Sequence, residues 1–252
     1  MREEFLKDGY VIQADINSEK TINRVRELIG DKVPLIVADP PYGNIVSEYW
    51  DYAEDADKFC SWMLKWTKEW GDLICNNGAF YIWGGIGKPE FRPFIKFASK
   101  IEDEKDFLIA NWITWNKKRA YGVKHNYLFT REELLYLSKG DPKKPHIFNI
   151  PLLEQKRGYA GYNQKYPAKS EFLRRTNVWN ETEIFSGKLH ECQKPNRVSE
   201  IPIETHTNPG DIVIDLFAGS ASTSAAARRL GRKWIAIELD EKEFQKILVR
   251  MA

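Results

Sequence analysis

The stretch from residue 212 to residue 238 constrains the fold of this chain more than any other. An apolar run (Ile212 to Leu216) is followed by a small-residue turn around Gly219, a helical segment, and a second apolar run that ends on Glu238. The acid lies nineteen positions after the glycine, as in the mononucleotide-binding half of a doubly wound fold. The turn has one glycine where a dinucleotide fingerprint has three. The pattern therefore favours a nucleoside without a pyrophosphate.

The remaining sequence alternates between strand and helix patterns, which predicts an α/β fold with a doubly wound, mostly parallel sheet. A turn at Asn76-Asn77-Gly78 is expected to lead into the strand at 79–83, and residues 134–137 are expected to form an antiparallel neighbour. The other predicted strands are 10–14, 34–38, 107–115 and 234–237. The predicted helices are 18–29, 52–70, 89–100, 197–206, a segment ending at Leu230, and the C-terminal stretch.

The apolar run at 35–37 ends in Asp39, Pro40, Pro41 and Tyr42. Each proline fixes its own φ, lacks a backbone donor and pushes the preceding residue into an extended conformation. The result is a stiff strand end that carries a carboxylate acceptor, proline carbonyls and an aromatic face. Such a set suits a planar substrate with an exocyclic amino group. An ordinary turn is the alternative, because Asp and Pro are common turn residues.

Composition narrows the class of protein without deciding the function. The 252 residues carry a formal charge of +2, so nucleic-acid binding would require a local concentration of charge. Three cysteines lack zinc-ligand spacing, which indicates a reducing compartment and no metal site. Neither a signal peptide nor an apolar run of transmembrane length is recognised. We expect a cytoplasmic protein that associates with DNA and not with membranes.

Positive charge is concentrated in the segment 139–190, where regular patterns disappear. Over 139–175 the basic residues outnumber the acidic residues by nine to three, and aromatic residues lie between them. This mixture is typical of contact with phosphates and bases; a solvated loop is the alternative. We expect 139–190 to be an irregular target-recognition insertion and the catalytic domain to comprise 1–138 and 191–252. The candidate nucleic-acid contacts are Lys165, Lys169, Arg174 and Arg175.

Two of these motifs, 39–42 and 217–221, together resemble the S-adenosylmethionine-dependent amino-methyltransferases of DNA, and their order along the chain resembles the β group. That group has an Asp-Pro-Pro-Tyr half first (here 39–42), then the target-recognition region, then the cofactor half (here 217–221, Phe-Ala-Gly-Ser-Ala). Residues 193–195 resemble the Gln-Lys-Pro segment that precedes the cofactor strand. The resemblance spans about residues 10–248. It implies a Rossmann-like class I methyltransferase fold with a circularly permuted motif order.

The resemblance also implies roles for individual residues. Asp39 and the Pro40 carbonyl would accept hydrogen bonds from the amino group of a flipped base, and Tyr42 would stack on that base. Glu238 would hold the cofactor ribose and Asp15 would contact the adenine. The implied catalytic residues are Asp39, Pro40, Pro41 and Tyr42. The implied cofactor-binding residues are Asp15, Asp39, Lys194, Pro195, Asp215, Phe217, Ala218, Gly219, Ser220, Ala221, Ser222, Thr223 and Glu238.

Asp as the first residue of the catalytic motif goes more often with adenine N6 than with cytosine N4 in this family. The resemblance therefore implies sequence-specific N6-adenine methylation of double-stranded DNA. N4-cytosine methylation, RNA adenine methylation and a silent nucleic-acid-binding subunit stay open. The resemblance is compatible with a cognate restriction endonuclease that is not a required subunit. It is also compatible with a homodimer. Ala221 departs from the family, which usually has glycine there, and would strain the loop if φ is positive.

Overall fold

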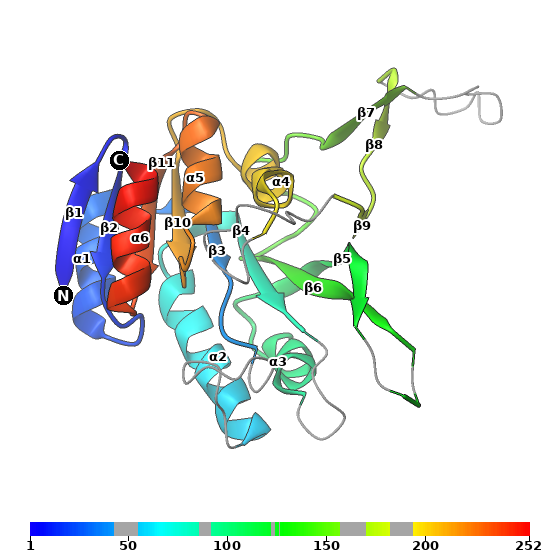
Figure 1. Ribbon diagram of the computed structural model, residues 1–252, viewed down its shortest axis with the longest axis horizontal. Coiled ribbons are helices and arrows are strands. Elements are labelled where there is room, and N and C mark those ends of the chain that lie inside the picture. The colour runs from blue at the N-terminus through cyan, green and yellow to red at the C-terminus, as the bar shows by residue number, and fades with distance from the viewer. Residues whose placement is uncertain (43–54, 86–91, 122–123, 126, 157–169, 182–193) are drawn as a thin grey trace.

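A computed structural model describes residues 1–42, 55–85, 92–121, 124–125, 127–156, 170–181 and 194–252. Figure 1 shows one sheet with helices on both faces and a separate two-stranded hairpin that extends from it. The main-sheet strands are β1 (Arg2–Leu6), β2 (Gly9–Gln13), β3 (Val33–Ala38), β4 (Ile74–Gly84), β5 (Leu108–Tyr121), β6 (Phe129–Ser138), β9 (Val178–Trp179), β10 (Ile212–Leu216) and β11 (Lys233–Glu238). The hairpin consists of β7 (Leu152–Lys156) and β8 (Phe172–Arg174).

The main sheet has the order β1-β2-β11-β10-β3-β4-β6-β5-β9. Strands β2, β11, β10, β3 and β4 are parallel, while β6 runs antiparallel between β4 and β5. The parallel strands read as continuous apolar runs because both of their faces are covered; in β3, all six residues are buried. The predicted doubly wound α/β fold is confirmed, with the antiparallel strand where it was expected.

The side chains of the central strands alternate between two hydrophobic layers. One layer packs under the first three helices, which are α1 (Glu19–Ile29), α2 (Ala56–Gly71) and α3 (Pro93–Ile101). The other packs under α4 (Asn196–His206), α5 (Ser222–Arg229) and α6 (Glu241–Met251). In β3, for example, Ile36 enters the first layer and Val37 the second. No helix among the described residues is long and apolar enough to span a membrane.

The expected turn at 76–78 is wrong, because these residues lie inside β4. The pairing of β3 with β4 shifts there, and Asn77 adopts a φ of 60°. Two backbone hydrogen bonds stabilise the bulge. The Asn77 N–H donates to the Lys139 carbonyl at 2.7 Å, and the Asn77 carbonyl accepts from the His146 N–H at 2.8 Å. A local kink in β4 therefore anchors the chain that follows β6.

The segment 139–190 is more regular than its composition suggests. It contributes the β7–β8 hairpin, and β9 joins the far edge of the main sheet beside β5. Asn149 also fastens the start of this segment to the end of α4, since its side-chain amide donates to the carbonyls of Glu204 and Thr207 at 2.9 and 3.1 Å.

Candidate active site

The carboxyl ends of β10 and β3 lie side by side, although about 180 residues separate them in sequence. Leu216 pairs with Ala38, and the Asp39 backbone N–H donates to the Leu216 carbonyl at 3.4 Å. The chain leaves β10 toward β11 on one side and leaves β3 toward β4 on the other. This boundary is a topological switch point, where open α/β sheets bind their ligands. The segments that begin at Asp39 and Phe217 therefore leave the sheet together.

Asp39 lies at the centre of a group of polar side chains. Its Oδ1 accepts from the Tyr42 hydroxyl at 3.1 Å, and its Oδ2 accepts a short charge-assisted hydrogen bond from Lys194 Nζ. The Lys194 side chain is only 7% exposed and its ammonium lies 4.5 Å from the centroid of the Trp83 ring. Lys194 is thus held against the Asp39 carboxylate, a contact that the sequence analysis did not predict.

Glu132 on β6 completes this group from two strands away. Its Oε2 is 3.1 Å from the Tyr42 hydroxyl and 3.6 Å from Lys194 Nζ, while its Oε1 accepts from Lys117 Nζ at 2.6 Å. Burial by itself would raise the pKa of Glu132, but the ammonium groups of Lys194 and Lys117 hold that pKa below its ordinary value. Glu132 is therefore a buried carboxylate that stays ionised. We name Asp39, Tyr42, Lys117, Glu132 and Lys194 the carboxylate–lysine cluster.

The loop after β10 is held in an unusual conformation. Phe217, Gly219 and Ala221 all have positive φ, at 60°, 47° and 54°. Behind the loop, Asp215 Oδ2 accepts from the backbone N–H and the hydroxyl of Ser224 at 3.0 and 2.8 Å. Burial raises the pKa of Asp215 to about 7, against the opposing effect of these hydrogen bonds. Asp215 therefore braces the start of α5 from the buried side of the loop.

Glu238 connects the tip of β11 to the same loop. Its Oε2 accepts from the Gly219 backbone N–H at 2.7 Å, and its Oε1 accepts from the N–H groups of Leu239 and Asp240 at 2.8 and 2.9 Å. A carboxylate offers about four lone-pair sites, so one site on Oε2 is left for a ligand hydroxyl. Burial raises the pKa of Glu238, although these N–H groups oppose the shift.

The geometry places an amino-group acceptor beside a nucleoside-type loop, and the comparisons with known proteins agree with it. A family model described as DNA methylase, the N6_N4_Mtase model, matches residues 33–249. The chain belongs to this DNA methylase family.

Named relatives of this DNA methylase include the DNA adenine methyltransferase YhdJ of Escherichia coli (strain K12). YhdJ is 30% identical over 241 residues, which cover 90% of this chain and 79% of YhdJ. The type II methyltransferase M.BamHI of Bacillus amyloliquefaciens is 29% identical over 88% of this chain, which spans only 53% of M.BamHI. Among solved structures, the M1.HpyAVI–SAM complex has a TM-score of 0.62 at 25% identity and covers 95% of this chain and 98% of its own.

The predicted site residues of this DNA methylase divide into those at the switch point and those elsewhere. Asp15 follows β2 at the same edge of the sheet, exposed, with Oδ1 accepting from Asn17. Pro195 caps α4 next to Lys194. The other predicted cofactor residues lie in the loop after β10 and in the first turn of α5. Four of them have buried side chains that pack on the inner side of the loop: Ala218, Ser220, Ala221 and Thr223.

The predicted nucleic-acid contacts need one correction. Arg175 forms a buried ion pair with Glu181, and its side chain is 8% exposed. Its charge is already neutralised inside the protein, so we withdraw it as a phosphate contact. Arg174 is exposed and lies over the Phe148 ring, 5.6 Å from the centroid. Lys165 and Lys169 lie outside the described residues.

Glu132 and Lys117 are the members of the cluster that sequence analysis missed. A signal was present, because Glu132 comes two residues before the buried apolar run of β6, in which Leu134, Leu135 and Leu137 are fully buried. A carboxylate at such a position needs a cationic partner, and Lys117 follows the predicted strand 107–115, in a part of β5 that the prediction did not include. What the sequence did not reveal was which face of β6 carries Glu132.

The positive φ of Ala221 permits a direct test of loop strain. Ala221→Gly relieves about 1–2 kcal/mol of left-handed strain but removes a buried methyl worth about 0.8 kcal/mol and adds about 0.5–1 kcal/mol of unfolded-state entropy. We expect its free energy of unfolding in urea to change by less than about 1 kcal/mol. Ala221→Val, with a branched side chain in the same buried position, should lose more than about 2 kcal/mol. Equal stabilities for the two variants would contradict the observed conformation.

Proposed function

We propose that this chain transfers the methyl group of S-adenosylmethionine to the exocyclic N6 of adenine in double-stranded DNA, at a specific sequence. The observation that carries the proposal is the placement of Asp39 beside the loop 217–221 at the switch point. Family membership narrows the base to adenine or cytosine, and Asp in the first position of 39–42 favours adenine. The 30% identity to the adenine methyltransferase YhdJ supports the same choice.

The residues at the switch point fit S-adenosylmethionine. A methyl group built on Gly219 would find no atom closer than the Phe217 carbonyl at 4.0 Å, so the backbone there is open to a ligand. Glu238 retains an acceptor site for a ribose hydroxyl. Asp15 follows β2, the strand that pairs with β11, and would contact the adenine. When bound, S-adenosylmethionine supplies an electrophilic methyl group on a sulfonium.

The chemistry of the acceptor explains why a carboxylate and a carbonyl are needed. An exocyclic amine is a weak nucleophile because its lone pair is delocalised into the ring. Asp39 and the Pro40 carbonyl would accept its two N–H groups, which favours a pyramidal nitrogen aligned for in-line attack. Tyr42 would stack on the extruded base and offset part of the few kcal/mol that extrusion requires. Attack precedes loss of the proton, so Asp39 acts as an acceptor and not as a strong base.

Methyl transfer from labelled S-adenosylmethionine tests this function. The purified chain is incubated with unmethylated duplex DNA and, in parallel, with RNA, and the products are digested to nucleosides. We expect the label in N6-methyladenine from DNA. Label in N4-methylcytosine, label only in RNA, or no labelled base would each contradict the proposal, and the last result would favour a silent subunit.

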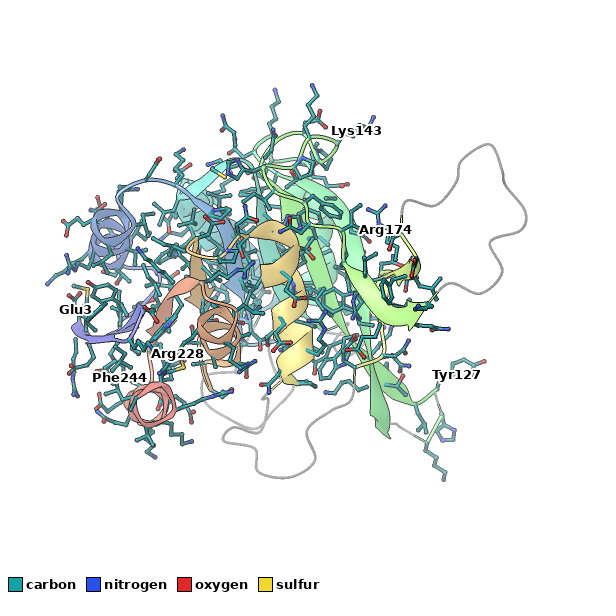
Figure 2. The ribbon with its side chains drawn as sticks, turned by 90° about the horizontal axis from the view of Figure 1, so that it is seen from above. Glu3, Tyr127, Lys143, Arg174, Arg228 and Phe244 are labelled. Atoms are coloured by element: carbon teal, nitrogen blue, oxygen red, sulfur yellow. The ribbon has the colours of Figure 1, made fainter. Side chains whose placement is uncertain are left out.

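Segment 139–190 is proposed as the target-recognition region, with 1–138 and 191–252 forming the catalytic domain. Figure 2 places Arg174 on β8, far from α6 and its Phe244. The arginine is exposed, rests on an aromatic ring and belongs to the hairpin that extends from the sheet. These features suit a phosphate contact at the edge of a DNA-binding surface.

Arg174→Gln should therefore weaken DNA binding and reduce its salt dependence. One lost phosphate contact lowers the slope of log affinity against log salt by about 1, measured by fluorescence anisotropy on a labelled duplex. Lys20→Gln is the matched control, since Lys20 is an exposed residue of α1 at the opposite end of the sheet. An equal slope for Arg174→Gln and the wild type would contradict the assignment.

The biological setting is proposed on the same basis. DNA as the substrate places the protein inside the cell, in the cytoplasm with the chromosome. Type II methyltransferases among the relatives support pairing with a cognate restriction endonuclease that is not a required subunit. A homodimer is a further proposal, which light scattering of the purified chain would test: a monomeric mass would contradict it.

A further inference from the structure

The carboxylate–lysine cluster contains two carboxylates and two ammonium groups, but the proposed chemistry uses only one carboxylate. Asp39 receives the substrate amine, whereas Glu132 lies on a different strand and is 17% exposed. Each charge of the cluster has an opposite partner: Asp39 pairs with Lys194, and Glu132 pairs with both Lys194 and Lys117. A largely buried carboxylate that is kept ionised at this position requires an explanation beyond packing.

Lys194 is shared between the two carboxylates. An ammonium has three donors, and three acceptors surround this one: Asp39 Oδ2, the Tyr42 hydroxyl at 3.4 Å and Glu132 Oε2 at 3.6 Å. Tyr42 is shared in the same way, with its hydroxyl 3.1 Å from both Asp39 Oδ1 and Glu132 Oε2. Glu132 is thus the second acceptor for both groups that contact Asp39.

We propose that Glu132 is a positioning residue for methyl transfer: it offers Lys194 and Tyr42 a second acceptor, to which both can turn when the Asp39 oxygens accept the substrate amine. The inference rests on the proposed function and assigns a role at the same site. Among the described members of the cluster, loss of Glu132 leaves the Asp39 carboxylate to pair with Lys194. The ammonium then competes with the substrate N–H groups for the Asp39 lone pairs.

Charge balance acts in the same direction. With Glu132 ionised, the two ammonium groups and two carboxylates of the cluster sum to zero. Loss of the Glu132 charge leaves one excess positive charge close to the amine nitrogen, which itself becomes positive as the methyl group arrives. Electrostatic effects on a developing charge are large in a site that excludes water. Glu132 should therefore act mainly on the chemical step and little on the binding of S-adenosylmethionine.

The neighbouring Glu133 provides a matched control. Successive side chains of a strand point to opposite faces, and Glu133 accordingly accepts from Trp112 Nε1 and Thr114 Oγ1 at 2.7 and 2.9 Å and pairs with Arg131. Its side chain is 2% exposed, so Glu133→Gln should lower the thermal stability. Its partners Trp112, Thr114 and Arg131 are not members of the cluster, so kcat should stay within about twofold of the wild type.

The test compares steady-state methylation of duplex DNA by the wild type, Glu132→Gln and Glu133→Gln. We expect Glu132→Gln to lower kcat by about 10- to 100-fold, while the Kd for S-adenosylmethionine, measured by calorimetry, changes less than about threefold. A double-mutant cycle then asks whether Glu132 acts through Lys194. In a Lys194→Met background, the effect of Glu132→Gln on kcat should shrink to less than about threefold.

Lys117→Met gives a second measurement that does not depend on the folding of Glu132→Gln. Loss of a neighbouring ammonium raises the pKa of Glu132, so the acidic limb of the kcat–pH profile should move to higher pH. The groups that face Glu132 and also titrate or carry charge are Asp39, Tyr42, Lys117 and Lys194. An unmoved acidic limb would overturn the inference.

The outcomes separate the inference from the function on which it rests. An active wild type with a fully active, folded Glu132→Gln would overturn the inference alone, as would an undiminished effect of Glu132→Gln in the Lys194→Met background. An inactive wild type would contradict the proposed function, and the inference would fall with it. Three results together support the inference: kcat falls in Glu132→Gln, kcat is retained in Glu133→Gln, and Glu132→Gln has little effect on kcat in the Lys194→Met background.

Discussion

Asp39→Ala is expected to lower methyl transfer at least about 10³-fold, because it removes the acceptor that orients the substrate amine for attack. The Kd for S-adenosylmethionine should change less than about threefold, since the ribose and adenine contacts proposed for Glu238 and Asp15 are untouched. Lys194 would keep Glu132 and Tyr42 as neighbours, so the variant should still fold. Single-turnover methylation and calorimetry measure the two quantities separately.

The control for this variant is Asp15→Ala, which should show the opposite pattern. Loss of a hydrogen bond to a charged group is worth about 1.5–3 kcal/mol, or roughly 10- to 100-fold in the Kd for S-adenosylmethionine. Turnover at saturating cofactor should change much less. Retained turnover in Asp39→Ala, or equal loss of binding in both variants, would refute the separation between the catalytic and cofactor halves of the site.

Asp215→Asn is expected to stabilise the protein above neutral pH. Burial raises the pKa of Asp215 to about 7 in the folded state, against about 3.9 when unfolded. A raised carboxyl pKa means that the contribution of this group to stability is fully present below about pH 4 and is lost as the pH rises toward 7. A shift of about three units corresponds to roughly 4 kcal/mol. Asparagine avoids this loss and still offers an oxygen to Ser224.

Urea unfolding at a series of pH values measures this effect. At pH 8 the variant should be more stable than the wild type by up to about 4 kcal/mol, and the difference should vanish near pH 4. Ser224→Ala removes a hydroxyl that donates to Asp215 at 2.8 Å. Because this hydrogen bond lowers the pKa of Asp215, the pKa should rise further in Ser224→Ala, and that variant should lose stability over a higher pH range than the wild type. Parallel stability profiles for the wild type and Asp215→Asn would show that Asp215 ionises normally in the fold.

The fold and the two halves of the site were predictable because their signals are local. Apolar runs at 35–38 and 212–216 mark buried parallel strands, and the residues at their carboxyl ends must meet at one edge of the sheet. Asp39, Gly219 and Glu238 are therefore placed by the order of strands. The φ of Ala221 was also accessible, since a family glycine at one loop position points to a left-handed backbone.

The rest of the site depends on contacts that a linear sequence does not display. Glu132 and Lys194 meet Asp39 from β6 and from the start of α4, so their partners are fixed only by the pairing of strands and the packing of helices. Arg175 looked like a phosphate contact until its ion pair with Glu181 was seen. Asn77 looked like a turn residue, but its bonds to Lys139 and His146 stabilise a bulge within β4. Tertiary contacts overrode local chemistry at each of these positions.

The most direct test of the central claim is sequencing, with detection of modified bases, of DNA from cells that express this chain. The host should lack adenine methylation of its own, and cells that express Asp39→Ala serve as the control. We predict N6-methyladenine at one recurrent sequence, present with the wild-type chain and absent with the variant. N4-methylcytosine at a recurrent sequence, or modification that is equal in both strains, would contradict the account.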